Sequence, residues 1–325
     1  MRDKHDSRPA TSIPTISMTS YHRGKGAIQR WLGWRTYEVL RTTQRFWRAA
    51  LQGKQLLFVH TMGKVASSSI TQALQASPSG HRLMIYHTHF LSPPGLALAH
   101  DLADRGFTGP NLTPADPREF LVRNAVLSQQ LRQLWRWGRR VKVITLVRDV
   151  VATNLSGYFY NSYAWPADLR RAAQARQPGV LEQLAADFLA HYPHEFPLNW
   201  FDMEVKNVFA IDVFAQPFAQ EQGYQIYRGD RADLLLLKLD RLADCADAAF
   251  KTFLGLPHCQ LRRVNEADDH WYRSLYQEFT AAGRLPASYL TQMYETRYTH
   301  HFFSQSEQLR FRRRWSQADP QRTLL

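Results

Sequence analysis

The chain of 325 residues is 44% hydrophobic and 13% aromatic, which suffices for one large folded domain or two small ones. Its formal net charge of +13 and isoelectric point near 9.9 favour polyanionic partners: nucleotides, acidic glycans, anionic lipid surfaces or nucleic acid. The composition excludes a disulfide-stapled scaffold, and no apolar run approaches the length needed to span a bilayer.

The N-terminal residues and the two cysteines are used to predict the cellular compartment of the protein. The chain does not open with the apolar core of a signal peptide. Cys245 and Cys259 have no metal-ligand spacing, so a reducing compartment is the simpler interpretation. We expect a cytoplasmic protein, at most peripheral to a membrane.

Residues 1–53 are predicted to form a disordered tail and a basic amphipathic helix. Residues 1–22 are polar without periodicity, whereas 27–51 interleave apolar residues such as Leu40 with arginines such as Arg41. Such a helix can lie on an anionic membrane, or it can pack on the core with its arginines solvated. The sequence leaves both arrangements open.

An anion-binding loop follows the first predicted strand. The apolar run 56–61 is typical of a strand buried on both faces, and helical spacing resumes at Ile70. The residues assigned to the loop are Gly63, Lys64, Val65, Ala66, Ser67, Ser68 and Ser69. Free N–H groups at a helix N-terminus, small side chains, one ammonium and three hydroxyls favour a phosphate there. A serine-capped helix that binds nothing is the alternative.

The rest of the chain alternates strands with helices. Further strands are predicted at 83–86, 141–147, 225–227 and 234–239. Helices are predicted at 120–138, 150–159, within 166–179, and at 180–191, 240–254, 271–279, 287–298 and 304–315. Residues 92–95 are interpreted as a break and 96–118 as loop-rich. This alternation predicts an α/β fold: one three-layer domain over 54–316 with a central, mainly parallel sheet, extra helices at both ends, and a flexible C-terminus at 317–325.

A second strand-to-helix junction carries a cation. The strand 141–147 ends in Arg148-Asp149, and Ser156 lies eight residues after Arg148 in the next helix. In open α/β sheets ligands collect at the carboxyl ends of the strands, and a guanidinium can bind a phosphate through two donors. An Arg148–Asp149 surface ion pair is the alternative.

The two junctions together resemble sulfotransferases that use 3′-phosphoadenosine 5′-phosphosulfate (PAPS). That family holds the 5′-phosphosulfate on a lysine-and-hydroxyl loop after its first strand and the 3′-phosphate on a later arginine and serine. The resemblance covers about 55–315 and implies a P-loop-like sulfotransferase architecture, PAPS as co-substrate, Lys64 as a catalytic cation, and Arg148 and Ser156 as cofactor ligands. Val65 and Ala66 depart from the hydroxyl and glycine that are commoner there.

A narrower resemblance concerns the acceptor. Residues 60–64 and Asn199-Trp200-Phe201 are similar to bacterial capsular polysaccharide synthesis proteins. That resemblance implies transfer to a carbohydrate hydroxyl, with glycan contacts expected from basic and aromatic residues. The residues named for these contacts are Arg118, Arg123, Tyr160, Tyr163 and Trp165.

We predict His89 as the catalytic base, because histidine has the most suitable pKa near neutrality. His87, two residues earlier, is predicted to point to the same side of the strand. A histidine held by the backbone and a zinc site at His87 and His89 are the alternatives, although the zinc site has no nominated third ligand. No metal is required for sulfuryl transfer, since Lys64 and Arg148 supply the neutralising charge.

Two other classes of function remain. A P-loop kinase is disfavoured by Phe58, which occupies the first glycine position of its loop, and by Val65, which follows the lysine. A non-enzymatic protein bound to membrane or nucleic acid would use the arginine-rich segments 30–48 and 310–314. No nucleic-acid module accompanies these segments, so nucleic acid is not an expected partner.

Overall fold

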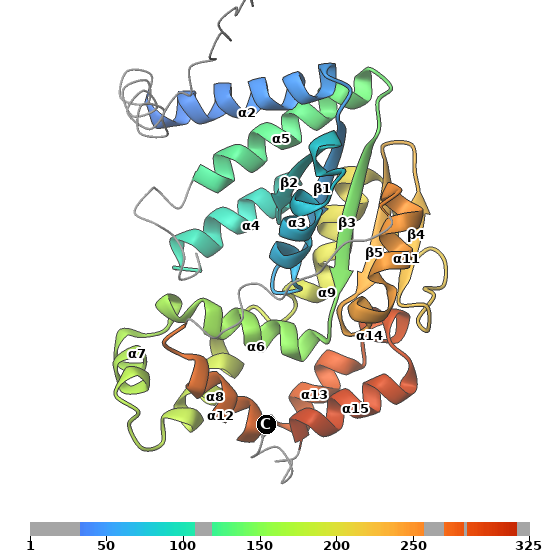
Figure 1. Ribbon diagram of the computed structural model, residues 1–325. Helices are drawn as coiled ribbons and strands as arrows, with labels where there is room; N and C mark the ends of the chain where they lie inside the picture. The colour runs from blue at the N-terminus through green and yellow to red at the C-terminus, as the bar shows by residue number, and fades with distance from the viewer. Residues whose placement is uncertain (1–32, 108–118, 257–269, 283–284, 317–325) are drawn as a thin grey trace, which may run out of the picture.

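The computed structural model describes residues 33–107, 119–256, 270–282 and 285–316. Its centre is a sheet of five strands in the order β2-β1-β3-β5-β4 (Figure 1). The strands are β1 (Gln55–His60), β2 (Leu83–Thr88), β3 (Val141–Val147), β4 (Tyr224–Arg228) and β5 (Ala232–Lys238). β4 is antiparallel to β5 at one edge, and the other four are parallel. The predicted α/β fold with a mainly parallel sheet is confirmed.

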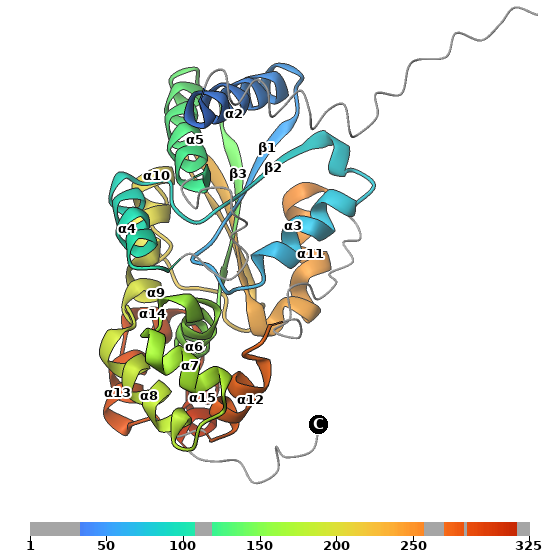
Figure 2. The ribbon, with the colours of Figure 1, turned by 90° about the vertical axis from the view of Figure 1, so that its left-hand side faces the viewer.

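Helices cover both faces of the sheet, as a parallel sheet requires (Figure 2). One face carries α2 (Trp34–Leu51), α4 (Pro93–Asp104), α5 (Glu119–Arg136) and α10 (Asn207–Phe209). The other carries α3 (Ser67–Ala76) and α11 (Leu242–Leu254). β1 and β3, in the middle of the sheet, are almost entirely buried. Their uninterrupted apolar sequences follow from this cover on both sides.

A group of helices lies beyond the carboxyl ends of the strands, at the bottom of Figure 1. Its members are α6 (Val150–Tyr160), α7 (Ala167–Gln174), α8 (Val180–His191), α9 (Phe196–Trp200), α12 (Arg273–Ala282), α13 (Ala287–Tyr294), α14 (Arg297–Phe302) and α15 (Gln305–Ser316). A π-helical segment, η3 (Phe201–Lys206), joins α9 to α10. Short 3₁₀ turns are η1 (Gly80–Arg82), η2 (Ser162–Ala164) and η4 (Leu239–Arg241).

Two predictions about helices are wrong. The segment interpreted as a break and a loop contains α4, whose N-cap Ser92 accepts a hydrogen bond from Gly95 N at 2.9 Å and whose first positions are proline. Proline suits the first turn of a helix, where its missing N–H has no partner to lose. The helix predicted at 287–298 is two helices, because Thr296 has extended backbone and caps α14.

Several predictions fall outside the described residues. They are the disordered tail at 1–22, the beginning of the 27–51 helix, Arg118, Cys259 and the C-terminus at 317–325. Within the described part of the chain, no helix is both long and apolar enough to cross a membrane.

The buried carboxylate of Asp149 joins the C-terminal helices to the sheet. Asp149 follows β3 and caps α6 by accepting from Val151 N at 3.0 Å. It also accepts from Tyr294 OH on α13 at 2.8 Å and from Trp315 Nε1 on α15 at 2.9 Å. Three donors therefore depend on one carboxylate that is only 6% exposed.

Replacing Asp149 with alanine should lower the free energy of unfolding by about 3–5 kcal/mol, because three buried donors lose their acceptor. Urea denaturation measures the change. The matched control is Asp168→Ala, which removes an exposed aspartate paired with Arg171 and should cost less than about 1 kcal/mol. Equal losses in the two variants would contradict the role given to Asp149.

Candidate functional site

The loop between β1 and α3 has an unusual backbone. Gly63, Lys64 and Ala66 have φ values of 87°, 56° and 62°, all in the left-handed region. This conformation is costly for residues with a Cβ and is concentrated at functional sites. The turn brings the chain directly from the buried end of β1 onto the N-terminus of α3.

Several amides of this loop lack a hydrogen-bond partner within the described part of the chain. The first helical bond of α3 runs from Ile70 N to Ala66 O at 3.2 Å. Among the described residues, the amides of 64–68 donate to no acceptor. Free N–H groups and the positive end of the helix dipole make this loop suited to an anion.

The serine-capped alternative is wrong. The N-cap of α3 is Ala66, which has no side chain able to cap. Val65 is fully buried and helps to fix the loop, while Ser68 is half-buried and Ser69 buried.

Two cations, Lys64 and Arg148, lie at this loop. Arg148 Nη1 donates to the carbonyl oxygen of Lys64 at 2.8 Å, and Lys64 Nζ lies 3.7 Å from the ring centroid of Tyr160. In the described parts of the chain, neither cation has an acidic partner. Burial, together with the Arg148 charge, lowers the pKa of Lys64 to about 8. A bound anion would relieve this repulsion.

The structure excludes one of the two interpretations of Arg148. Asp149 faces Tyr294 and Trp315 rather than Arg148, so the predicted alternative of an Arg148–Asp149 surface pair is wrong. Ser156 is half-buried on α6, one turn before Tyr160, and residues four apart share a helix face. Ser156 therefore lies on the face of α6 that meets Lys64, although it makes no hydrogen bond among the described residues.

His89 reaches the loop from the end of β2. Its Nδ1 lies 2.7 Å from the carbonyl oxygen of Thr61, which can only accept, so Nδ1 carries the proton. Nε2 is then the unprotonated nitrogen. Burial lowers the pKa of His89 and keeps the ring neutral. A Cβ built on Gly63 would lie 3.9 Å from His89 Cε1, so this edge of the ring faces the loop.

His87 points to the same side as His89, as predicted, with ring centroids 4.8 Å apart. Its Nε2 lies 2.8 Å from Ser67 Oγ, the first residue of α3. Burial lowers its pKa to about 3. His87 therefore ties the end of β2 to the helix N-terminus.

Three further residues complete the site and were missed from the sequence. Trp200 Nε1 donates to His89 O at 3.1 Å, and His60 Nδ1 lies 2.9 Å from Thr88 Oγ1. His60 Nε2 also lies 3.2 Å from Glu204 Oε2, at an angle outside that of a hydrogen bond. The sequence indicated Trp200 only indirectly, because it belongs to the segment 199–201 that is similar to capsular polysaccharide synthesis proteins. His60 belongs to the segment 60–64 of the same resemblance, whereas Glu204 belongs to no motif.

Glu204 fixes the segment that follows His89. Its carboxylate accepts from Leu91 N at 2.8 Å and from Ser92 N at 3.0 Å, at the N-terminus of α4. A Cβ on Gly95 would approach Glu204 Oε1 to 1.7 Å, so glycine is required for this contact. The carboxylate lies in the π-helical η3, and such segments are frequent at functional sites.

No group of three or more His, Cys, Asp or Glu side chains is arranged to hold a metal in the residues described. The zinc alternative for His87 and His89 thus gains no third ligand from them.

The comparisons with known proteins bear on this site. A family model described as putative capsular polysaccharide synthesis protein matches residues 194–304, about a third of the chain. Searches of the curated proteins and of the solved structures found no match. The likeness to capsular polysaccharide synthesis proteins, predicted from residues 60–64 and 199–201, is confirmed over 194–304, and residues 60–64 lie outside the match. The match includes Trp200 and Glu204 but not the anion loop or Arg148.

The lowered pKa of Lys64 predicts a pH-dependent stability. Between about pH 8 and 10.5 the unfolded chain binds a proton that the native site does not, so the free energy of unfolding should rise with pH. The slope should be at most about 1.4 kcal/mol per pH unit. Urea denaturation of wild type and Lys64→Met across this range isolates the effect, because other titrations cancel in the difference. Parallel curves would show that Lys64 titrates normally.

Proposed function

We propose that this protein is a sulfotransferase that moves a sulfuryl group from PAPS to a hydroxyl of a carbohydrate, in the synthesis of capsular or other surface polysaccharide. The observation that supports this best is that Arg148 Nη1 donates to the Lys64 carbonyl oxygen at 2.8 Å, which brings both cations to the loop of unbonded amides with no acidic partner among the described residues. PAPS carries anionic groups at its 5′ and 3′ positions, so it uses two cations together.

Lys64 and the loop amides fit the 5′-phosphosulfate. As the sulfuryl group leaves in line, its bond to the 5′-phosphate oxygen breaks and negative charge grows on that phosphate. Preorganised donors stabilise such charge best when they need not rearrange, and each is worth roughly 3 kcal/mol. The strained loop and the Tyr160 ring hold Lys64 before the ligand arrives.

Arg148 and Ser156 fit the 3′-phosphate. The Arg148 backbone is fixed between Tyr298 and the end of β3, since Tyr298 OH donates to Arg148 O at 2.9 Å. A fixed guanidinium retains further N–H donors for a phosphate beyond the one used on Lys64 O.

His89 fits the base that takes the acceptor proton. Its Nδ1–H is held by the Thr61 carbonyl, which leaves Nε2 with a lone pair, and its lowered pKa keeps that nitrogen unprotonated at neutral pH. The new bond forms between the acceptor oxygen and sulfur as His89 takes the proton. His87 is a weaker candidate because its Nε2 contacts Ser67.

A carbohydrate acceptor is supported by the similarity to capsular polysaccharide synthesis proteins. Of the glycan contacts predicted from the sequence, Tyr163 is 55% exposed and stays a candidate. Trp165 is 4% exposed and stacked on Tyr158, so it belongs to the core. Tyr160 lies beneath Lys64 instead.

A P-loop kinase is less well supported. It needs a hydroxyl directly after the lysine and an acidic residue at a strand end to hold magnesium. Val65 is an apolar, buried residue, and the Asp149 carboxylate is occupied by Val151, Tyr294 and Trp315.

Adenosine 3′,5′-bisphosphate should raise the melting temperature without magnesium. Calorimetry should show binding that is at least about 100-fold weaker in Lys64→Met and in Arg148→Met, because each removes a charge-assisted contact. Lys251→Met, which removes an exposed lysine on α11, is the control. Stabilisation only by ATP with magnesium would favour the kinase instead.

His89→Ala should bind the bisphosphate normally but transfer sulfate from PAPS about 10²- to 10⁴-fold more slowly, since only the base is lost. His191→Ala, an exposed histidine on α8, should be unaffected. Turnover of His89→Ala within a few-fold of wild type would assign the proton transfer to another residue.

A further inference from the structure

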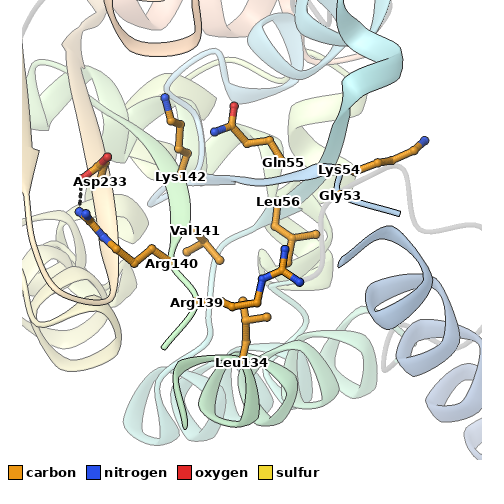
Figure 3. Close-up of a pocket in the computed structure, with 10 residues that line it drawn as sticks. All are labelled: Gly53, Lys54, Gln55, Leu56, Leu134, Arg139, Arg140, Val141, Lys142 and Asp233. Carbon is orange, nitrogen blue, oxygen red and sulfur yellow. Dashed lines mark hydrogen bonds and ion pairs between the residues drawn. The ribbon is translucent and has the colours of Figure 1, made fainter. Parts of the chain in front are cut away.

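The end of the sheet opposite the candidate site carries a second cluster of cations. A pocket of about 320 Å³ is lined by Lys54, Arg139, Arg140, Lys142 and Asp233, at the amino ends of β1, β3 and β5 (Figure 3). A neighbouring pocket of about 300 Å³ shares Lys54 and adds Arg45 and Arg48 from α2. The residues that line the two pockets thus include six cations and one carboxylate, that of Asp233.

These cations are only partly neutralised. Figure 3 shows Arg140 directed to Asp233, and Arg228 binds the same carboxylate at 2.6 Å. Arg139 Nη1 donates to Ala50 O at 3.0 Å, at the end of α2. Arg45, Arg48 and Lys54 have no acidic partner in the part of the chain that the structure describes.

An exposed apolar stripe on α2 borders this cluster. Leu40 and Leu51 lie on the side of α2 opposite the buried Phe46 and Thr42. Beside them is the half-buried Trp47, whose Nε1 donates to Gln130 Oε1 on α5 at 2.7 Å. Leu40 and Leu51 are 54% and 79% exposed. The helix is thus apolar on two sides, one packed on α5 and β1 and the other open.

Trp137 extends the stripe onto the turn between α5 and β3. Its ring lies 4.7 Å from Trp47, centroid to centroid, and the residue is 65% exposed. Arg139 follows two residues later in the same turn. Exposed leucine and tryptophan next to cations are the composition of surfaces that lie in a membrane interface.

We infer that the surface formed by Leu40, Leu51, Trp137 and the cations around Lys54 docks on an anionic lipid bilayer. Leucine and tryptophan enter the interface, and the lipid phosphates meet Arg48, Lys54 and Arg139. The helix α2 therefore combines the two arrangements considered from the sequence: one of its sides packs on the core, and the other faces lipid.

Other occupants fit less well. A soluble polyanion accounts for the cations but leaves Leu51 and Trp137 in water. A second copy of the chain, joined about a two-fold axis, would oppose like charges at the same patch. The bilayer alone meets both the apolar and the charged side chains.

Docking in this way leaves the candidate site open to water. The six residues of β1 separate Gln55, at the docking end, from His60, next to the anion loop. At about 3.3 Å per residue this separation is roughly 17 Å, with the loop on the side away from the bilayer. A soluble nucleotide therefore has free access while the protein is bound.

Flotation with vesicles tests the inference. Wild type should bind vesicles of phosphatidylcholine with phosphatidylglycerol, and bind phosphatidylcholine alone weakly. The double variant Arg48→Gln, Lys54→Gln should bind the anionic vesicles roughly 20-fold more weakly, because it lacks two surface charges. The double variant Leu51→Ser, Trp137→Ser should bind the same vesicles at least about tenfold more weakly, because it lacks two apolar side chains that enter the interface.

The matched controls are Leu309→Ser and Arg313→Gln, exposed residues on α15, which should bind as wild type does. Far-ultraviolet circular dichroism, measured in parallel, verifies that each variant folds. Unchanged vesicle binding in Leu51→Ser with Trp137→Ser would overturn the inference. The inference would also be overturned if the wild type bound dextran sulfate but not vesicles. The same holds if analytical ultracentrifugation showed that the wild type is a dimer and the double variant Leu51→Ser, Trp137→Ser is a monomer.

Discussion

The structure places two cations at one strand edge, and no acidic residue of the described ranges 33–107, 119–256, 270–282 and 285–316 pairs with either of them. Lys64 and Arg148 are brought together at the carboxyl ends of adjacent strands, with Arg148 donating to the Lys64 carbonyl at 2.8 Å. Burial and this proximity already lower the pKa of Lys64 to about 8. A strained loop that holds a largely buried ammonium near a guanidinium is best explained by a ligand that supplies negative charge.

The buried polar residues behind the loop hold it in place. His87 joins β2 to Ser67, His89 is fixed by Thr61, and Glu204 holds the segment after His89. Trp200, from the matched segment 194–304, donates to the His89 carbonyl. The segment 194–304, which is similar to capsular polysaccharide synthesis proteins, thus helps to position His89, which lies outside that match.

The sequence predicts the sheet better than the surroundings of the site. Buried parallel strands are continuous apolar runs, so β1, β3 and β5 were recognisable from 56–61, 141–147 and 234–239. The meeting of Lys64 with Arg148 follows from the rule that strand ends share an edge. Glu204 was not predictable, because its partners lie more than a hundred residues away and its π-helical backbone has no sequence pattern. The helix α4 was missed because prolines were interpreted as a break.

The molecule has two clusters of cations, Lys64 with Arg148 and the group around Lys54, and a crystal structure can show which of them binds the nucleotide. A crystal structure with adenosine 3′,5′-bisphosphate should place its 5′-phosphate on the amides of 64–68 and Lys64 Nζ, and its 3′-phosphate on the Arg148 guanidinium. A bisphosphate bound instead at Lys54 and Arg139, or a Lys64–Arg148 site that stays empty at saturating ligand, would contradict the account.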